Sequence, residues 1–205
     1  MYNKRPVNFA NVRGNAVLLG QQFVGEVLHK GCVAVDATAG NGYDTLYLAN
    51  LVGISGKVYA FDVQQAALDV TARRLTQFGL DKNVQLIHDG HEKMDMYINT
   101  PVDAFIFNLG YLPGGDHDII TRSQTTTRAL QIALELLKPG GRISLVVYTG
   151  HCGAGEESRA VEEMAAGLNP LVFGVLKVAF INKSVAAPFL IFIERVKKEN
   201  ESLAP

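Results

Sequence analysis

The sequence predicts an α/β fold on a Rossmann-like sheet of seven mostly parallel strands, with helices on both faces and a C-terminal antiparallel hairpin. Short β-branched runs alternate with helical patterns between about Cys32 and Val147, which is typical of βαβ units on a parallel sheet. Two apolar runs follow, at 171–181 and 187–196, and only the segment 182–186 separates them. Because so short a connection cannot hold a crossover helix, these runs should pair as antiparallel strands.

Local patterns predict the individual elements. Parallel strands are expected at 32–36, 57–62, 84–88, 102–108 and 142–148. Helices are expected at about 15–30, 64–79, 125–139 and 155–168. In the second helix Phe78 should lie on the apolar face, just before Gly79, a favourable residue for ending a helix. In the third, Leu137 should be the last apolar contact before Pro139 stops the helix.

Composition indicates one well-packed domain. The chain has 205 residues, of which 48% are hydrophobic and 19% charged, so residues 1–205 are expected to form a single domain. Residues 1–30 should supply an N-terminal segment and a helix that packs on the core. The formal net charge of −1 gives no general basic surface, so a nucleic-acid partner would have to meet a local patch.

Cysteine usage and the N-terminal residues bear on the compartment. Cys32 and Cys152 lie far apart and in different motifs, which favours free thiols over a disulfide framework, and no metal site is expected. The first residues lack the apolar core of a signal peptide, and no apolar run approaches the roughly 18 residues that a membrane span needs. We therefore expect a cytoplasmic protein without a membrane partner.

The segment "VAVDATAGNGYDT" at 33–45 runs from the first strand into a loop of small residues. Its glycines would let the backbone approach a ligand closely and turn into the next helix. It contains neither the G-x-G-x-x-G of dinucleotide sites nor the G-x-x-x-x-G-K-[ST] of phosphate-binding loops. Asp62 ends the second strand. Its separation from Asp36, at the end of the first strand, is close to the roughly 20 residues after which an acidic side chain meets ribose hydroxyls in nucleotide folds.

The fourth strand ends in "FIFNLGYLPGGDH", which resembles the (N/D)-P-P-(Y/F) motif of amino-group methyltransferases. Asn108 and Tyr111 occupy the matching positions, and Leu109 and Gly110 replace the two prolines. In that motif the first side chain accepts a hydrogen bond from the amine and the aromatic ring flanks the substrate. A neutral amine is required, and either a nearby base, with Asp116, His117 and His151 as the candidates, or simple desolvation of the amine would favour that form.

The order "DATAGNGYDT … HDGHE … NLGYLPGGDH … KPGGRISLVVYTGHCGAGEE" covers nearly the whole chain and resembles the YtqB/MnmM family of class I S-adenosylmethionine-dependent methyltransferases. Thr38 departs from the class by standing where its first glycine usually lies, and Cys152 departs from the family, where a proline is expected. The resemblance implies S-adenosylmethionine as cofactor, with Asp62 at the ribose and Asp89 at the adenine amine. The donor-binding residues it implies are Asp36, Thr38, Gly40, Asn41, Gly42, Asp44, Thr45, Asp62, Gln64, Asp89, Gly90, His91 and Asn108.

The resemblance also implies a substrate: the aminomethyl group of 5-aminomethyl-2-thiouridine at the tRNA wobble position, presented by the anticodon loop. Tyr111 and Tyr148 are candidates for stacking on bases, and a homodimer could present one subunit's surface beside the other's pocket. Cations that could contact phosphates are Lys4, Arg5, Arg13, Arg122 and Arg128. Three alternatives remain: methylation of rRNA or a small-molecule amine, a nicotinamide-dependent oxidoreductase, and a noncatalytic cofactor-binding module.

Overall fold

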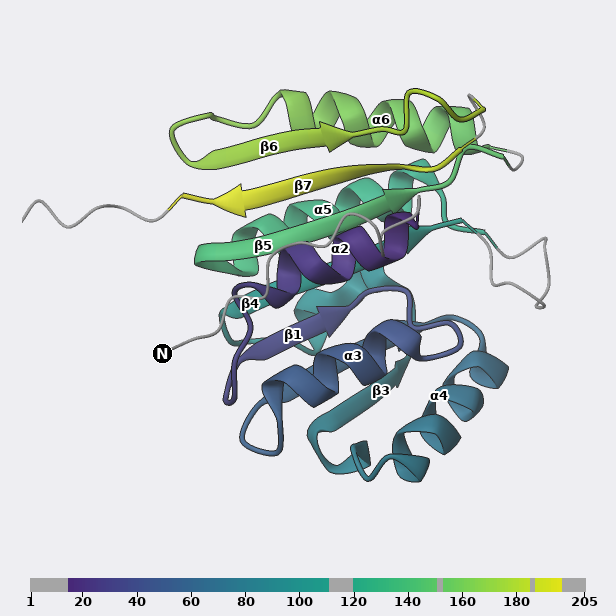
Figure 1. Cartoon of the computed structure of the whole chain (residues 1–205), viewed down its shortest axis with the longest axis vertical. Coiled ribbons are helices and arrows are strands. Elements are labelled where there is room, and N and C mark those ends of the chain that lie inside the picture. The colour runs from purple at the N-terminus through teal and green to yellow at the C-terminus, as the bar shows by residue number, and fades with distance from the viewer. Residues whose placement is uncertain (1–14, 111–119, 151–152, 185–186, 197–205) are drawn as a thin grey trace, which may run out of the picture.

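A single mixed sheet forms the centre of the molecule. The computed structural model describes residues 15–110, 120–150, 153–184 and 187–196. The strand order is β3-β2-β1-β4-β5-β7-β6 (Figure 1). The strands are β1 Val33–Asp36, β2 Lys57–Asp62, β3 Val84–His88, β4 Val102–Leu109, β5 Leu137–Val147, β6 Phe173–Val178 and β7 Phe189–Arg195. Neighbours from β3 to β5 pair in parallel, and β7 pairs antiparallel with β5 and β6, so the predicted sheet and terminal hairpin are confirmed.

Helices cover both faces of this sheet. The layer of α2, α3 and α4 packs on one face, and the layer of η2, α5 and α6 packs on the other (Figure 1). The bounds are α2 Ala16–Gly25, α3 Tyr43–Val52, α4 Gln65–Gln77, η1 Asp81–Asn83, η2 His91–Met96, α5 Ser123–Leu136 and α6 Ala154–Ala166. In the described segments, every helix is too short or too polar to cross a membrane.

The central strands are apolar on both sides because helices cover both faces. In β4 the side chains of Phe105 and Phe107 are fully buried and belong to the cluster beneath α5. Ala104 and Ile106 alternate with them and belong to the cluster beneath α3. This burial leaves the strand ends as the place where polar side chains can meet a ligand.

Three local expectations need correction. The first helix was expected to run to about residue 30, but it ends at Gly25. Gly25 packs closely against α3, because a Cβ at this position would collide with the Tyr47 hydroxyl. Leu137 is buried as expected, but it begins β5 instead of ending α5, with extended φ/ψ of −65° and 126°. The proline at 139 explains this because it cannot continue a helix. Phe78 follows α4 and is 59% exposed, so it lies outside the core.

Candidate functional site

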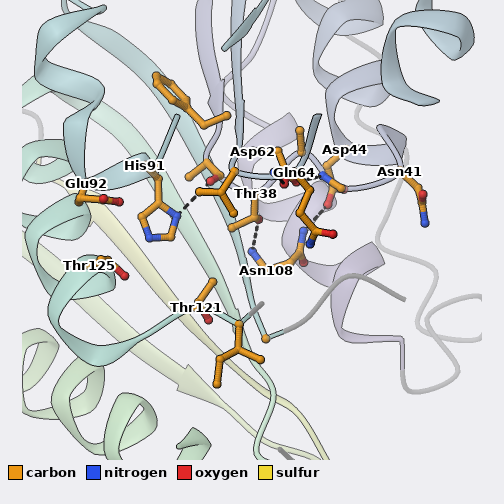
Figure 2. A pocket seen from close by; sticks show the side chains of 18 of the residues that line it. Thr38, Asn41, Asp44, Asp62, Gln64, His91, Glu92, Asn108, Thr121 and Thr125 are labelled. Atoms are coloured by element: carbon orange, nitrogen blue, oxygen red, sulfur yellow. Dashed lines mark hydrogen bonds between the residues drawn. The ribbon is translucent and has the colours of Figure 1, made fainter. Parts of the chain in front are cut away.

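A cavity of about 810 Å³ opens at the carboxyl ends of the parallel strands. It lies where β1 is flanked by β2 on one side and β4 on the other, which is where ligands bind in open α/β sheets. Most of the expected donor-binding residues line it: Thr38, Gly40, Asn41, Asp44, Asp62, Gln64, Asp89, Gly90, His91 and Asn108. Figure 2 shows seven of these residues, which come from segments far apart in the sequence: Thr38, Asn41, Asp44, Asp62, Gln64, His91 and Asn108.

The other three expected residues, Asp36, Gly42 and Thr45, lie behind the cavity wall. Asp36 is fully buried, and its carboxylate accepts hydrogen bonds from the Thr45 hydroxyl (2.6 Å) and the Thr38 backbone N–H (3.2 Å). Gly42 has φ +77°, and a Cβ there would come within 2.6 Å of Thr71 Oγ1. We therefore expect these three residues to support the loop from beneath, without touching a ligand.

Burial, together with the nearby charge of Asp44, raises the pKa of Asp36 to about 7, against the lowering effect of its two hydrogen bonds. Between about pH 4 and pH 7 the folded protein therefore holds a proton that the unfolded chain has released. Because the folded state then binds more protons, raising the pH through this window lowers the free energy of unfolding.

Asp36→Asn should remove this pH dependence, because the amide is nearly the same shape and does not ionise. From pH 4.5 to pH 8 the wild type should lose roughly 2–3 kcal/mol of unfolding free energy relative to the variant. Urea denaturation at a series of pH values measures the difference. Parallel stability curves for the two proteins would show that the Asp36 carboxyl titrates normally.

Asp62 joins the end of β2 to the glycine loop. One of its oxygens accepts the Gly40 backbone N–H (2.8 Å) and the other accepts the Gln64 backbone N–H (2.9 Å). Burial raises its pKa, while these two bonds act in the opposite direction. Each oxygen keeps a second lone pair, so the carboxylate can accept two further hydroxyl groups, as a ribose diol requires.

The end of β3 supplies Asp89 and His91. Asp89 accepts hydrogen bonds from Lys93 (2.6 Å), Tyr97 (2.9 Å) and the Gly90 backbone N–H (2.8 Å), and the bond from Lys93 is the main reason that its pKa is lowered. His91 is buried, with Nδ1 3.1 Å from the Ala37 carbonyl oxygen, and burial lowers its pKa. The lowered pKa of Asp89 means that its carboxylate is ionised, and the hydrogen bonds from Lys93, Tyr97 and Gly90 hold it in place.

The end of β4 carries Asn108 in a network with α2 and α3. The Asn108 amide group donates from Nδ2 to Asp44 Oδ2 (2.6 Å), and Gln21 Nε2 donates to Asp44 Oδ1 (2.6 Å). A carboxylate cannot donate, so it orients both amides with their N–H groups toward it. The acceptor atom of this amide, Asn108 Oδ1, therefore does not bond to Asp44, and it has no hydrogen-bond partner among the described residues.

Thr38, which stands where the sequence resemblance predicts a glycine, links two strand ends. Its hydroxyl oxygen accepts the backbone N–H of Asn108 at 2.8 Å (Figure 2). This bond ties the loop after β1 to the end of β4. The side chain thus sets the distance between the residues expected to bind the donor and the residue expected to bind the amine.

The cavity carries more negative than positive charge. Among its described lining residues the carboxylates are Asp44, Asp62, Asp89 and Glu92, whereas Arg122 is the basic one. Asp44 is 6% exposed and lies in the first turn of α3, where a dinucleotide would place its pyrophosphate. A carboxylate there repels a pyrophosphate and favours a cationic ligand.

Sequence reasoning missed several lining residues, among them Tyr43, Val63, Glu92, Thr121 and Thr125. The first three could have been found from the sequence, since each directly follows a residue expected to bind the donor. No sequence pattern pointed to the two threonines. Tyr43 is 62% exposed; the Arg74 guanidinium lies 3.8 Å from its ring centre and donates to the Asn41 carbonyl (2.8 Å).

The residues expected on the substrate side are only partly described. Tyr148 and Arg122 line the cavity, whereas Arg128 forms an ion pair with Asp95 at 2.8 Å. Cys32 is a free, buried cysteine. The remaining expected residues lie outside the described part of the chain: Lys4, Arg5, Arg13, Tyr111, Asp116, His117, His151 and Cys152.

Comparison with known proteins places this chain in a family. The family model described as "Putative rRNA methylase" matches residues 58–194. A relative from Arabidopsis thaliana named "tRNA (mnm(5)s(2)U34)-methyltransferase, chloroplastic" is 43% identical over 185 residues, which cover 85% of this chain. The matched part spans 66% of that relative, slightly less than two thirds of its length.

Solved structures agree in sequence and fold. A crystal structure of a protein described as a putative rRNA-methylase from Clostridium thermocellum is 44% identical, with a TM-score of 0.87 and coverage of 89% of this chain and 98% of that one. Another, of a protein described as a putative methyltransferase from Streptococcus mutans in complex with SAH, is 41% identical, with a TM-score of 0.81 and coverage of 88% and 98%. The fold is thus the Rossmann-like fold of class I methyltransferases, and the chain belongs to the family described as "Putative rRNA methylase".

Proposed function

We propose that this protein transfers a methyl group from S-adenosylmethionine to an amine of an RNA substrate. The specific substrate proposed is the aminomethyl group of 5-aminomethyl-2-thiouridine at the tRNA wobble position, reached through the anticodon loop. The name of the plant relative supports this substrate, and the SAH complex of the Streptococcus mutans protein supports the cofactor.

The chemistry of the cavity fits the proposed donor. Asp62 offers lone pairs to the ribose hydroxyls, and Asp89 offers them to the adenine amine. Apolar surface from Phe61 and Val63 can cover the adenine ring. The acidic lining suits a ligand that carries both a sulfonium and an ammonium, whereas it opposes the pyrophosphate of a nicotinamide cofactor.

The observation that carries the reaction class is the orientation of Asn108. Because Asp44 holds its Nδ2, the Asn108 Oδ1, which is buried and has no partner among the described residues, can only accept a hydrogen bond, and in our proposal the bound amine donates it. Accepting an N–H fixes the direction of the nitrogen lone pair. A substrate without a hydrogen-bond donor at this point would leave the oxygen unpaired, which is costly for a buried group.

When bound, S-adenosylmethionine supplies an electrophilic methyl carbon, and displacement in line with the C–S bond forms N–CH₃ and leaves S-adenosylhomocysteine. The protein's contribution is then mainly alignment, since the attacking nitrogen must stay collinear with the bond that breaks. Thr38, in the loop after β1, and Asn108, near the end of β4, set that alignment. The nitrogen must also be neutral, so its proton has to leave before or during transfer.

The proposal is tested by incubating the protein with labelled S-adenosylmethionine and tRNA that carries 5-aminomethyl-2-thiouridine. Digestion to nucleosides should release labelled 5-methylaminomethyl-2-thiouridine. The matched control is the same tRNA with an unmodified wobble uridine, which should take up no label. Label found only in rRNA or in a small-molecule amine would instead support those substrates, and calorimetric binding of NADH without S-adenosylhomocysteine would overturn the methyltransferase assignment.

A further inference from the structure

A buried carboxylate outside the described site connects two helices. Glu157, in the first turn of α6, is 1% exposed. Its Oε1 accepts the Thr126 hydroxyl at 2.6 Å, and its Oε2 accepts the Thr121 hydroxyl at 2.8 Å. Burying a carboxylate is costly unless its oxygens are bonded, and these two hydroxyls serve one oxygen each. The position near the N-terminus of α6 also stabilises negative charge.

The two threonines differ in what else they touch. Thr121 lines the cavity, and its backbone N–H donates to the Gly110 carbonyl at 3.0 Å, two residues beyond Asn108. Thr126 is fully buried inside α5 and does not line the cavity. Glu157 therefore holds one side chain of the cavity wall and one purely internal side chain in the same way.

A second contact supports the same connection. Glu156 accepts the Ser123 hydroxyl at 2.8 Å, so the first turn of α6 holds the first turn of α5 at more than one point. The wall residues Ile120 and Arg122 flank Thr121 and also line the cavity. On the opposite side, Asp62 bonds to the backbone of the glycine loop and of Gln64, so a separate set of hydrogen bonds holds the donor side.

We propose that Glu157 is a positioning residue for the substrate: through Thr121 it holds the wall formed by residues 120–122 against Gly110, and thereby sets the substrate side of the cavity independently of the donor side. This rests on the proposed RNA methylation. The geometry that carries it is one buried carboxylate bridging a lining and a non-lining threonine. A role in stability alone would involve both threonines equally.

The test is a matched pair of variants, Thr121→Val and Thr126→Val, each of which removes one hydroxyl from Glu157 while keeping the shape of the side chain. Thr121→Val should raise KM for the RNA about tenfold with little change in kcat, because a shifted wall weakens substrate placement. Thr126→Val should leave the RNA KM near the wild-type value. Both should bind S-adenosylhomocysteine as the wild type does in calorimetry.

Two further variants act on the carboxylate itself. Glu157→Ala should behave like Thr121→Val, whereas Glu157→Gln should restore most of the RNA KM because its amide can accept from one threonine and donate to the other. Equal RNA KM values for the two threonine variants would overturn the proposal.

Hydrogen–deuterium exchange provides a readout that needs no RNA. Backbone amides at 120–122 should exchange faster in Thr121→Val and Glu157→Ala than in Thr126→Val. A wild type that methylates no wobble nucleoside would disprove the proposed substrate, while this exchange comparison would still test the positioning role. Unchanged exchange in all variants would overturn that role.

Discussion

Replacing Asn108 by alanine should lower kcat for RNA methylation by roughly 10²–10³-fold, the loss typical for removing one preoriented hydrogen-bonding group from a reaction site. The reason is geometric: the Asp44 carboxylate holds Nδ2 at 2.6 Å, which leaves the buried Oδ1, without a partner among the described residues, as the acceptor that we propose for the substrate amine. The backbone N–H that bonds to Thr38 is unaffected by the substitution. Affinity for S-adenosylhomocysteine should therefore change much less than kcat.

Single-turnover kinetics with saturating donor measure this effect, and calorimetry with S-adenosylhomocysteine measures the binding. The matched control is Asn99→Ala, which truncates an exposed asparagine away from the cavity and should leave both quantities unchanged. Asp44→Asn is a second variant: without a carboxylate to hold its Nδ2, the Asn108 amide can flip, and kcat should fall although Asn108 is present. A wild-type kcat in Asn108→Ala would exclude Asn108 from orienting the amine.

Asp62→Ala should weaken binding of S-adenosylhomocysteine by about 100-fold or more. The carboxylate accepts the backbone N–H groups of Gly40 and Gln64 and retains lone pairs for the ribose hydroxyls. Its loss removes charge-assisted hydrogen bonds, each worth about 1.5–3 kcal/mol, and also releases the glycine loop. Isothermal calorimetry gives the change in affinity directly.

Asp69→Ala is the control for Asp62→Ala. Asp69 is an exposed carboxylate on α4 that accepts a hydrogen bond from Gln65 and does not line the cavity. The two substitutions change the net charge equally, so a loss of affinity confined to Asp62→Ala would assign the effect to the specific bonds. Equal affinity of both variants and the wild type would place the ribose elsewhere.

Most of the fold could be predicted from local patterns. The bounds of β2 and β3 are those that the β-branched runs indicated, and the short connection at 182–186 correctly excluded a parallel pairing of the last two strands. The start of β5 was wrong because apolar periodicity does not distinguish the last residue of a helix from the first residue of a buried strand. Leu137 is buried either way, and only its backbone angles decide between the two.

The site was predictable to the extent that it follows strand ends. Asp62, Asp89 and Asn108 line one cavity because the carboxyl ends of parallel strands meet at one edge of the sheet. Asp36 is the instructive exception. It also ends a strand, yet its side chain lies beneath the loop, and Asp44, from the first turn of the following helix, lines the cavity instead.

Local chemistry was thus enough to indicate which strands and helices form and to place the glycine loop and most of the carboxylates at strand ends, because residue spacing reports which elements form, although it misplaced the end of the first helix and the start of β5. Contacts between distant segments decided the rest. No sequence pattern predicts that Asp44 accepts hydrogen bonds from both Gln21 and Asn108. Likewise, none predicts that Glu157 accepts from both Thr121 and Thr126. Those partners lie 23 to 64 positions apart and meet only when the helices pack on the sheet, so the orientation of each amide and hydroxyl is a property of the packed structure.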